Sequence, residues 1–149
     1  MRPGVRIALD LGTRRIGAAR CDGEAILAFP LATIDATSPD WRERVQSLVS
    51  EYGAMEVIIG HPVTLRGTDE LAALAVRDRA ASLAEVVADV PIRLVDERLT
   101  TATAHRQLRE AGHDSRSSRA AVDAAAAVGI LDFALEFERR TGNPPGEVL

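Results

Sequence analysis

The chain has 149 residues and a formal net charge of −4, a length that suits one domain and a charge that argues against a protein coating nucleic acid by bulk positive charge. Hydrophobic residues make up 46% of it but form no run of membrane-spanning length, and the single cysteine excludes a disulfide framework. The N-terminal residues do not have the pattern of a secretory signal, so we expect a cytoplasmic protein without a membrane partner.

Three strands are predicted at the start of the chain. Apolar residues alternate with others over residues 5–10, which end in an acid, and a short turn over 12–15 leads to a second strand over 16–20. Residues 25–34 supply a third strand. Pro30 has no N–H to donate within it, so we expect this strand at an edge of the sheet.

Helices and strands then alternate. Ser38 as N-cap and Pro39 at the first helical position predict a helix that Gly53 ends. A short apolar strand follows over residues 55–59. Thr68 is the expected cap of a long alanine-rich helix.

The last third of the chain begins with a strand over residues 91–95. Thr100 or Thr101 is expected to cap a helix that closes at Gly112, and a final helix is predicted over residues 119–138. This order predicts an α/β fold in which a mixed five-stranded sheet is flanked by helices. We expect one domain over residues 1–140 and a flexible C-terminal tail over 141–149.

Carboxylates stand at the ends of regular elements in three separate segments. Asp10 ends the first strand, Asp96 and Glu97 end the fifth, and Asp123 lies in the first turn of the last helix. In an open sheet, sites form in the crevice at the carboxyl ends of parallel strands, so these acids are candidates for one shared site. Each acid also has an ordinary interpretation as a helix cap, a salt-bridge partner or a solvated side chain, and an acid in a first helical turn is favourable anyway.

A cluster of carboxylates is unstable without a counter-charge. Two like charges about 4 Å apart repel by about 4 kcal/mol at an effective dielectric constant of about 20. Hard oxygen ligands favour Mg²⁺ or Mn²⁺. A pair of such ions activates water and stabilises the leaving oxygen of a phosphodiester, so the pattern is typical of a metal-dependent nuclease.

Several other residues are candidates for binding or catalysis. Arg14 and Arg15 in the first turn, and Arg98 beside the second acid, are candidates for binding phosphate, although Arg98 also suits a salt bridge that holds the acidic pair. All 18 basic residues are arginine, whose planar guanidinium binds two phosphate oxygens at once. His61 has two interpretations, a general base near a strand end or a solvated loop residue.

Four sequence blocks together resemble the YqgF/RuvX family. They are DLGTRRIG at 10–17, GHP at 60–62, DERLTT at 96–101 and DAAAA at 123–127, and their order and spacing extend the resemblance over nearly the whole chain. The resemblance implies an RNase H-like fold and a nuclease that matures the 5′ end of pre-16S rRNA or, alternatively, resolves Holliday junctions. Its partner is then nucleic acid, as structured RNA or branched DNA, and the protein is a monomer or a homodimer.

The resemblance also implies a site made of Asp10, Glu97 and Asp123, which serve as both catalytic residues and ligands of Mg²⁺ or Mn²⁺. Asp96 stays open as an alternative second ligand. Adjacent strand residues point to opposite faces, so Asp96 and Glu97 should not both reach one metal, and we favour Glu97.

The chain departs from the family pattern between the motifs. His61 stands where the family commonly has leucine, and Thr64 and Arg66 stand where an asparagine and an aspartate are usual. These changes leave the three acids intact but leave the substrate preference open. With only 3% aromatic residues, recognition should depend on backbone shape and phosphates more than on stacked bases.

Two other functions are compatible with parts of the sequence. Residues 8–13 also resemble the first phosphate-binding turn of the actin-like ATPases, which would make the chain a nucleotide-binding domain. Those proteins combine two such domains, and no second phosphate loop is visible here. The third alternative is a binding module that keeps the fold without catalysis, although a binder of phosphate gains only repulsion from a cluster of acids.

Overall fold

The protein is an α/β domain built on a six-stranded sheet, seen in a computed structural model that describes residues 1–61, 67–96 and 115–149. The strand order is β3-β2-β1-β4-β5-β6. The strands are β1 (Arg6–Leu11), β2 (Arg15–Cys21), β3 (Ala28–Asp35), β4 (Glu56–His61), β5 (Ile92–Asp96) and β6 (Glu147–Val148). The described helices are α1 (Trp41–Tyr52), α2 (Gly67–Val86) and α4 (Ser115–Thr141). None of them is long and apolar enough to cross a membrane.

The sheet is mixed, as predicted, and its strand directions follow from the connections. Strands β1, β2 and β3 form an antiparallel meander, β4 and β5 run parallel to β1, and β6 is antiparallel to β5. The expectation that the strand with Pro30 lies at an edge is confirmed, because β3 is the first strand in the order.

The predicted number of five strands is wrong by one. The sixth strand comes from the segment predicted as a tail, where Glu147 pairs with Leu94 and Val148 pairs with Arg93. The backbone N–H of Leu149 also donates to the carbonyl of Ile92 at 2.9 Å. A two-residue strand is too short to show an alternating pattern in the sequence. It is recognised only by its hydrogen bonds to the edge of β5.

Two element boundaries differ from the prediction for local reasons. Helix α1 begins at Trp41 because Ser38 starts a preceding turn, in which its carbonyl accepts from Trp41 N at 3.3 Å. Strand β3 begins at Ala28 because the Asp22 carboxylate accepts from the N–H groups of Ile26 (2.7 Å) and Leu27 (2.8 Å) and holds a loop there. The predicted helix over 100–112 lies outside the described residues.

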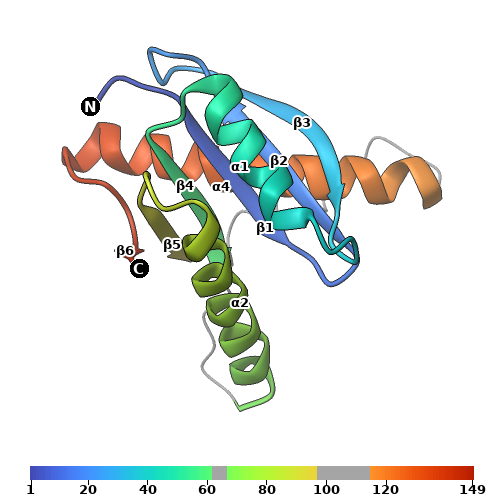
Figure 1. The fold of residues 1–149 in the computed structure, drawn as a ribbon. Coiled ribbons are helices and arrows are strands. Elements are labelled where there is room, and N and C mark those ends of the chain that lie inside the picture. The colour runs from blue at the N-terminus through green and yellow to red at the C-terminus, as the bar shows by residue number, and fades with distance from the viewer. Residues whose placement is uncertain (62–66, 97–114) are drawn as a thin grey trace.

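Helices cover both faces of the sheet and define two apolar cores (Figure 1). On one face α1 and α2 pack against alternate strand residues, which on β1 are Ile7, Leu9 and Leu11. On the other face α4 crosses the sheet and packs against the residues between them, such as Ala8. The alternation along each strand therefore assigns every side chain of the sheet to the α1/α2 face or the α4 face.

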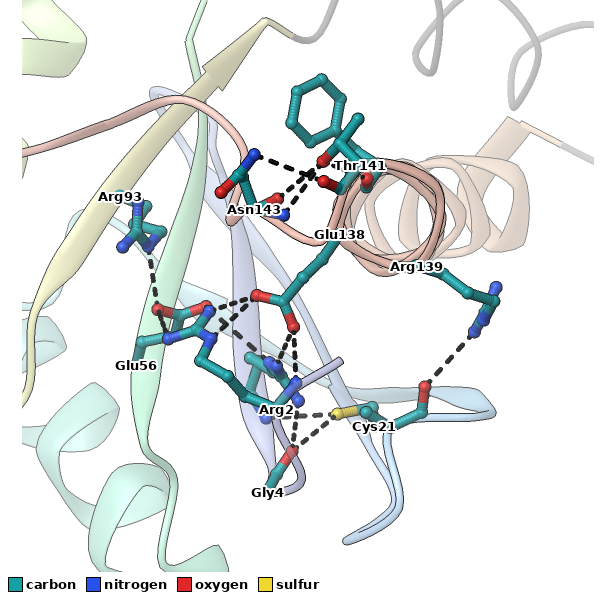
Figure 2. A network of polar contacts seen from close by, with 12 residues as sticks. Arg2, Gly4, Cys21, Glu56, Arg93, Glu138, Arg139, Thr141 and Asn143 are labelled. Atoms are coloured by element: carbon teal, nitrogen blue, oxygen red, sulfur yellow. Dashed lines mark hydrogen bonds and ion pairs between the residues drawn. The ribbon is translucent and has the colours of Figure 1, made fainter.

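At one end of the α4 face, a network of buried charges joins the helix to three strands (Figure 2). The Glu138 carboxylate of α4 accepts from Arg2 at 2.6 Å and from Arg6 at 2.7 Å. Glu56 of β4 accepts from Arg2 at 3.0 Å and from Arg93 at 2.9 Å. The side chains of Arg6 and Glu56 are each 1% exposed, and that of Glu138 is 3% exposed. No sequence pattern predicts this network, because its members lie up to 136 residues apart.

The charge of Glu138 is stabilised by this network. Burial alone would raise the pKa of Glu138, but hydrogen bonds and ion pairs with Arg2 and Arg6 outweigh burial and lower it. A carboxylate with a lowered pKa stabilises the fold at pH values above its ordinary pKa of 4.5. That contribution is lost as the pH falls through the pKa of the folded state.

We predict that Glu138→Gln lowers the free energy of unfolding by about 3 kcal/mol at neutral pH, because it removes the carboxylate that binds the buried guanidinium of Arg6 at 2.7 Å. Urea unfolding measures the change. Glu136→Gln is the matched control, since Glu136 pairs with Arg139 and Arg140 on the exposed side of the same helix, and should cost less than about 1 kcal/mol. The gap between Glu138→Gln and wild type should narrow as the pH falls below about 4.5. Equal losses in the two variants would contradict the role of the network.

Candidate active site

Asp10 lies near the carboxyl end of β1, on the face covered by α4. It shares a face of the sheet with Ala8, two residues earlier, which belongs to the core beneath α4. Its neighbours Leu9 and Leu11 belong to the other core. Across the β1–β2 pairing its partner is Gly17. Asp10 is therefore held in a regular strand, with a residue that has no side chain beside it.

Helix α4 brings Asp123 to that same place. A Cβ atom built on Gly17 would lie only 2.0 Å from the backbone carbonyl oxygen of Asp123, so the helix rests directly on the bare backbone of β2. Because Gly17 is also the pairing partner of Asp10, the backbones of both acids lie beside Gly17 on the α4 face. Two of the three acids proposed from the sequence thus stand on backbone segments that flank the same glycine.

The predicted position of Asp123 within its helix is wrong. Helix α4 begins at Ser115, eight residues before Asp123 (123 − 115), so Asp123 lies in the third turn and not the first. The first-turn dipole therefore gives no reason for an acid at this position. The prediction failed because residues 115–118 (SRSS) show no apolar periodicity that would reveal a helix.

Arg15, at the start of β2, pairs with one of the two acids. Its Nε donates to Oδ2 of Asp123 at 2.6 Å, and the two side chains are 39% and 18% exposed. Arg15 thus has a carboxylate as its partner in this structure, whereas the sequence led us to expect a phosphate. The same arginine also lines an open cavity of about 580 Å³, and the other lining residues are Arg14, Thr33, Ile34, Asp35 and Thr37.

Arg79 was not predicted as part of the site, yet it supports the turn that follows Asp10. From α2, its Nη1 donates to the carbonyl oxygens of Leu11 at 3.2 Å and Gly12 at 2.8 Å. Its guanidinium carbon lies 5.3 Å from the centre of the Trp41 ring, and burial lowers its pKa. An arginine four residues before the buried Leu83 was the available sign, but its partners are carbonyl groups that no motif marks.

Asp96 and His61 lie on the other face of the sheet. They are register partners in the pairing of β4 with β5. Each lies two residues after an apolar residue, Ile59 or Leu94, that packs on the α1/α2 side, so both share that face. The interpretation of His61 as a solvated loop residue is wrong, since it is the last residue of β4 and its Nε2 is buried with no hydrogen-bond partner among the described residues. Burial, reinforced by the charge of Arg77, lowers the pKa of His61.

The remaining predicted site residues are not described by the structure. Glu97 and Arg98 lie outside the described residues, as do Thr64 and Arg66. Within the described ranges no group of three His, Cys, Asp or Glu residues is arranged to hold a metal ion. Asp10 and Asp123 supply hard oxygen donors of the kind that Mg²⁺ and Mn²⁺ prefer, and an ion pair through one oxygen of Asp123 leaves its carboxylate further capacity to accept. The donor set thus fits such a cation.

Comparisons with known proteins agree on one family and one fold. A family model described as "RuvX: Holliday junction resolvase" matches residues 4–137. A Streptomyces coelicolor protein is 48% identical over 148 residues, covering 99% of this chain and 89% of that protein. A Cutibacterium acnes protein is 50% identical over 136 residues, covering 91% and 84%. Both carry the provisional name pre-16S rRNA nuclease.

Among solved structures, RuvC of Thermus thermophilus in complex with a Holliday junction substrate has a TM-score of 0.60 to this chain at 16% identity. The match covers 97% of this chain and 99% of RuvC. At this identity the likeness concerns the fold alone, and it confirms the predicted RNase H-like architecture.

We predict that Gly17→Ala destabilises the protein by about 1–3 kcal/mol, because its methyl group would overlap the Asp123 carbonyl and push α4 off β2. Gly23→Ala is the control, since no atom lies within 4 Å of a Cβ at that position, and it should change stability by less than about 0.5 kcal/mol. Denaturant unfolding of both variants measures the difference. A Gly17→Ala variant as stable as Gly23→Ala would mean that α4 does not rest on Gly17.

Proposed function

This chain belongs to the RuvX family, and from that membership we propose that it is a divalent-metal-dependent nuclease that hydrolyses phosphodiester bonds in structured nucleic acid. The observation that carries the proposal is that the backbones of Asp10 and Asp123 both lie beside Gly17 on the α4 face. Two carboxylates placed side by side repel unless a positive charge lies between or beside them. Such a pair is expensive to keep for structural reasons alone.

In the proposed site, Asp10 and Asp123 hold Mg²⁺ or Mn²⁺ together with Glu97. Asp96 is the weaker choice for this site, because it lies on the α1/α2 face, opposite to the face of Asp10. When bound, the cation supplies an activated water and a counter-charge for the leaving oxygen. The chain itself contributes the rigid placement of the acids, through β1 for Asp10 and through the contact of α4 with Gly17 for Asp123.

Binding of the substrate is proposed to depend on arginines at the same end of the sheet. Arg14 and Arg15 line the open cavity beside Asp123, and Arg98 is proposed to join them. Their charges suit the phosphates of a nucleic-acid backbone, which fix its position without reading its bases. Arg79 acts through the backbone, because its hydrogen bonds hold the turn between Asp10 and Arg15.

Two substrates are supported by different comparisons. The relatives named as pre-16S rRNA nucleases support processing of the 5′ end of that RNA during ribosome assembly, and we place this substrate first. The description of the family and the RuvC-like fold support Holliday junctions as the alternative. Symmetric cutting of a junction needs two active sites and therefore a homodimer, whereas cleavage of one RNA strand needs only a monomer. Family membership favours either nuclease over the actin-like nucleotide-binding alternative.

We predict that Asp10→Asn lowers the rate of cleavage by about 100-fold or more with Mg²⁺ or Mn²⁺, because the site loses a charged ligand. The assay compares a 5′-extended 16S rRNA precursor with a four-way DNA junction, and the wild-type rates decide between the two substrates. Asp89→Asn is the control and should leave both rates unchanged. Asp89 is an exposed acid that precedes the N-terminal end of β5, away from the end that carries Asp96. Undiminished cleavage by a folded Asp10→Asn variant would refute the proposed metal site.

A further inference from the structure

We infer that Arg15 is an exchangeable counter-ion, which pairs with Asp123 before the cation binds and with a phosphate of the nucleic acid afterwards. The inference rests on the proposed nuclease function and gives one residue two successive partners. Its starting point is the 2.6 Å hydrogen bond between Arg15 Nε and Asp123 Oδ2. This bond joins Arg15, which is proposed to bind phosphate, to Asp123, which is proposed to bind metal.

Asp123 cannot bind Arg15 and a divalent cation at the same time without weakening one of the two interactions. A guanidinium and a divalent cation are both positive, and at contact distance on one carboxylate they repel each other. Without the cation, Arg15 supplies the positive charge that Asp123 needs beside Asp10. Once the cation supplies it, the pair with Arg15 is weakened and the guanidinium is available for another anion.

The exposure of this ion pair makes exchange feasible. Arg15 and Asp123 are 39% and 18% exposed, and ion pairs near the surface are weak because water competes for both partners. The ion pair between Arg6 and Glu138 at the other end of α4 is the opposite case, with side chains 1% and 3% exposed. The ion pair of Arg6 with Glu138 is thus closed to solvent, whereas that of Arg15 with Asp123 is accessible to water and solutes.

The cavity beside the pair offers a place for the second partner. Arg15 and Arg14 line it together with the hydroxyl-bearing Thr33 and Thr37, and its volume of about 580 Å³ is in the range of small-ligand sites. The one acid in the lining, Asp35, is already engaged, because its Oδ1 accepts from the N–H (2.9 Å) and the hydroxyl (2.7 Å) of Thr37. The hydrogen bond to Asp123 uses Nε of Arg15, so the two Nη atoms form a second edge of the fork that suits two phosphate oxygens.

Calorimetric titration with Mn²⁺ alone tests the first half of the exchange. Arg15→Gln should bind Mn²⁺ about 3- to 5-fold more tightly than wild type, because the metal no longer displaces a guanidinium from Asp123. Arg14→Gln removes the same charge one residue away, and among the described residues Arg14 forms no ion pair with Asp123, so it should change the affinity less than about 2-fold. Arg15→Lys keeps the charge and should resemble wild type. Equal affinities of the two glutamine variants would overturn the inference.

The salt dependence of binding tests the second half. The better bound of the two proposed substrates is titrated with and without Ca²⁺, at a concentration where gels show no cleavage. Without Ca²⁺, Arg15→Gln should leave the slope of log K against log salt unchanged. With Ca²⁺ it should reduce the magnitude of that slope by about one, the change expected for the loss of one phosphate contact. Arg14→Gln should change the slope equally in both conditions. An effect of Arg15→Gln that is the same with and without Ca²⁺ would mean that Arg15 does not change partners.

The two proposals fail in different ways. If the wild type cleaves with Mg²⁺ and Arg15→Gln neither tightens Mn²⁺ binding nor shows a Ca²⁺-dependent slope, the exchange is wrong and the nuclease stands. If the variants behave as expected but no substrate is cleaved, the nuclease function is wrong and the ion-pair exchange stands as a metal-dependent binding device.

Discussion

The contact between the backbone of Asp123 and Gly17 is the constraint on which the site depends. It sets the distance between α4 and β2 at the carboxyl end of β1, where any side chain at position 17 would hold the helix away from the sheet. At its other end α4 is fixed by the buried carboxylate of Glu138, which two arginines of the N-terminal segment bind. Because α4 is fixed at these two points, Asp123 is positioned by packing and charge that lie mostly outside the site.

The sheet separates two pairs of polar residues that the sequence analysis singled out. Asp10 and Asp123 lie on the α4 face, whereas His61 and Asp96 lie on the α1/α2 face. One residue of register decides between these faces, since neighbouring strand residues point in opposite directions. In β5 the neighbouring residues Leu94 and Val95 belong to different cores, as the alternation expected for adjacent strand residues requires.

Local patterns in the sequence were sufficient for most of the fold. Strand alternation predicted β1 with Asp10 at its end, Pro30 predicted an edge strand, and Gly53 predicted the end of α1. What local patterns cannot predict is a partner far along the chain. The ion pair of Arg15 with Asp123 spans 108 residues, and that of Arg6 with Glu138 spans 132. The family resemblance named the acids of the site, but only the three-dimensional packing reveals that Arg15 is bound to one of them.

Both edges of the sheet are poorly suited to strand addition from a second molecule. At one edge β6 is only two residues long, and at the other β3 carries Pro30, which interrupts the row of donors that an incoming strand would need. The domain is thereby protected from polymerising through continuous intermolecular sheets. Both edges therefore favour a homodimer interface elsewhere on the surface over one made by extending the sheet.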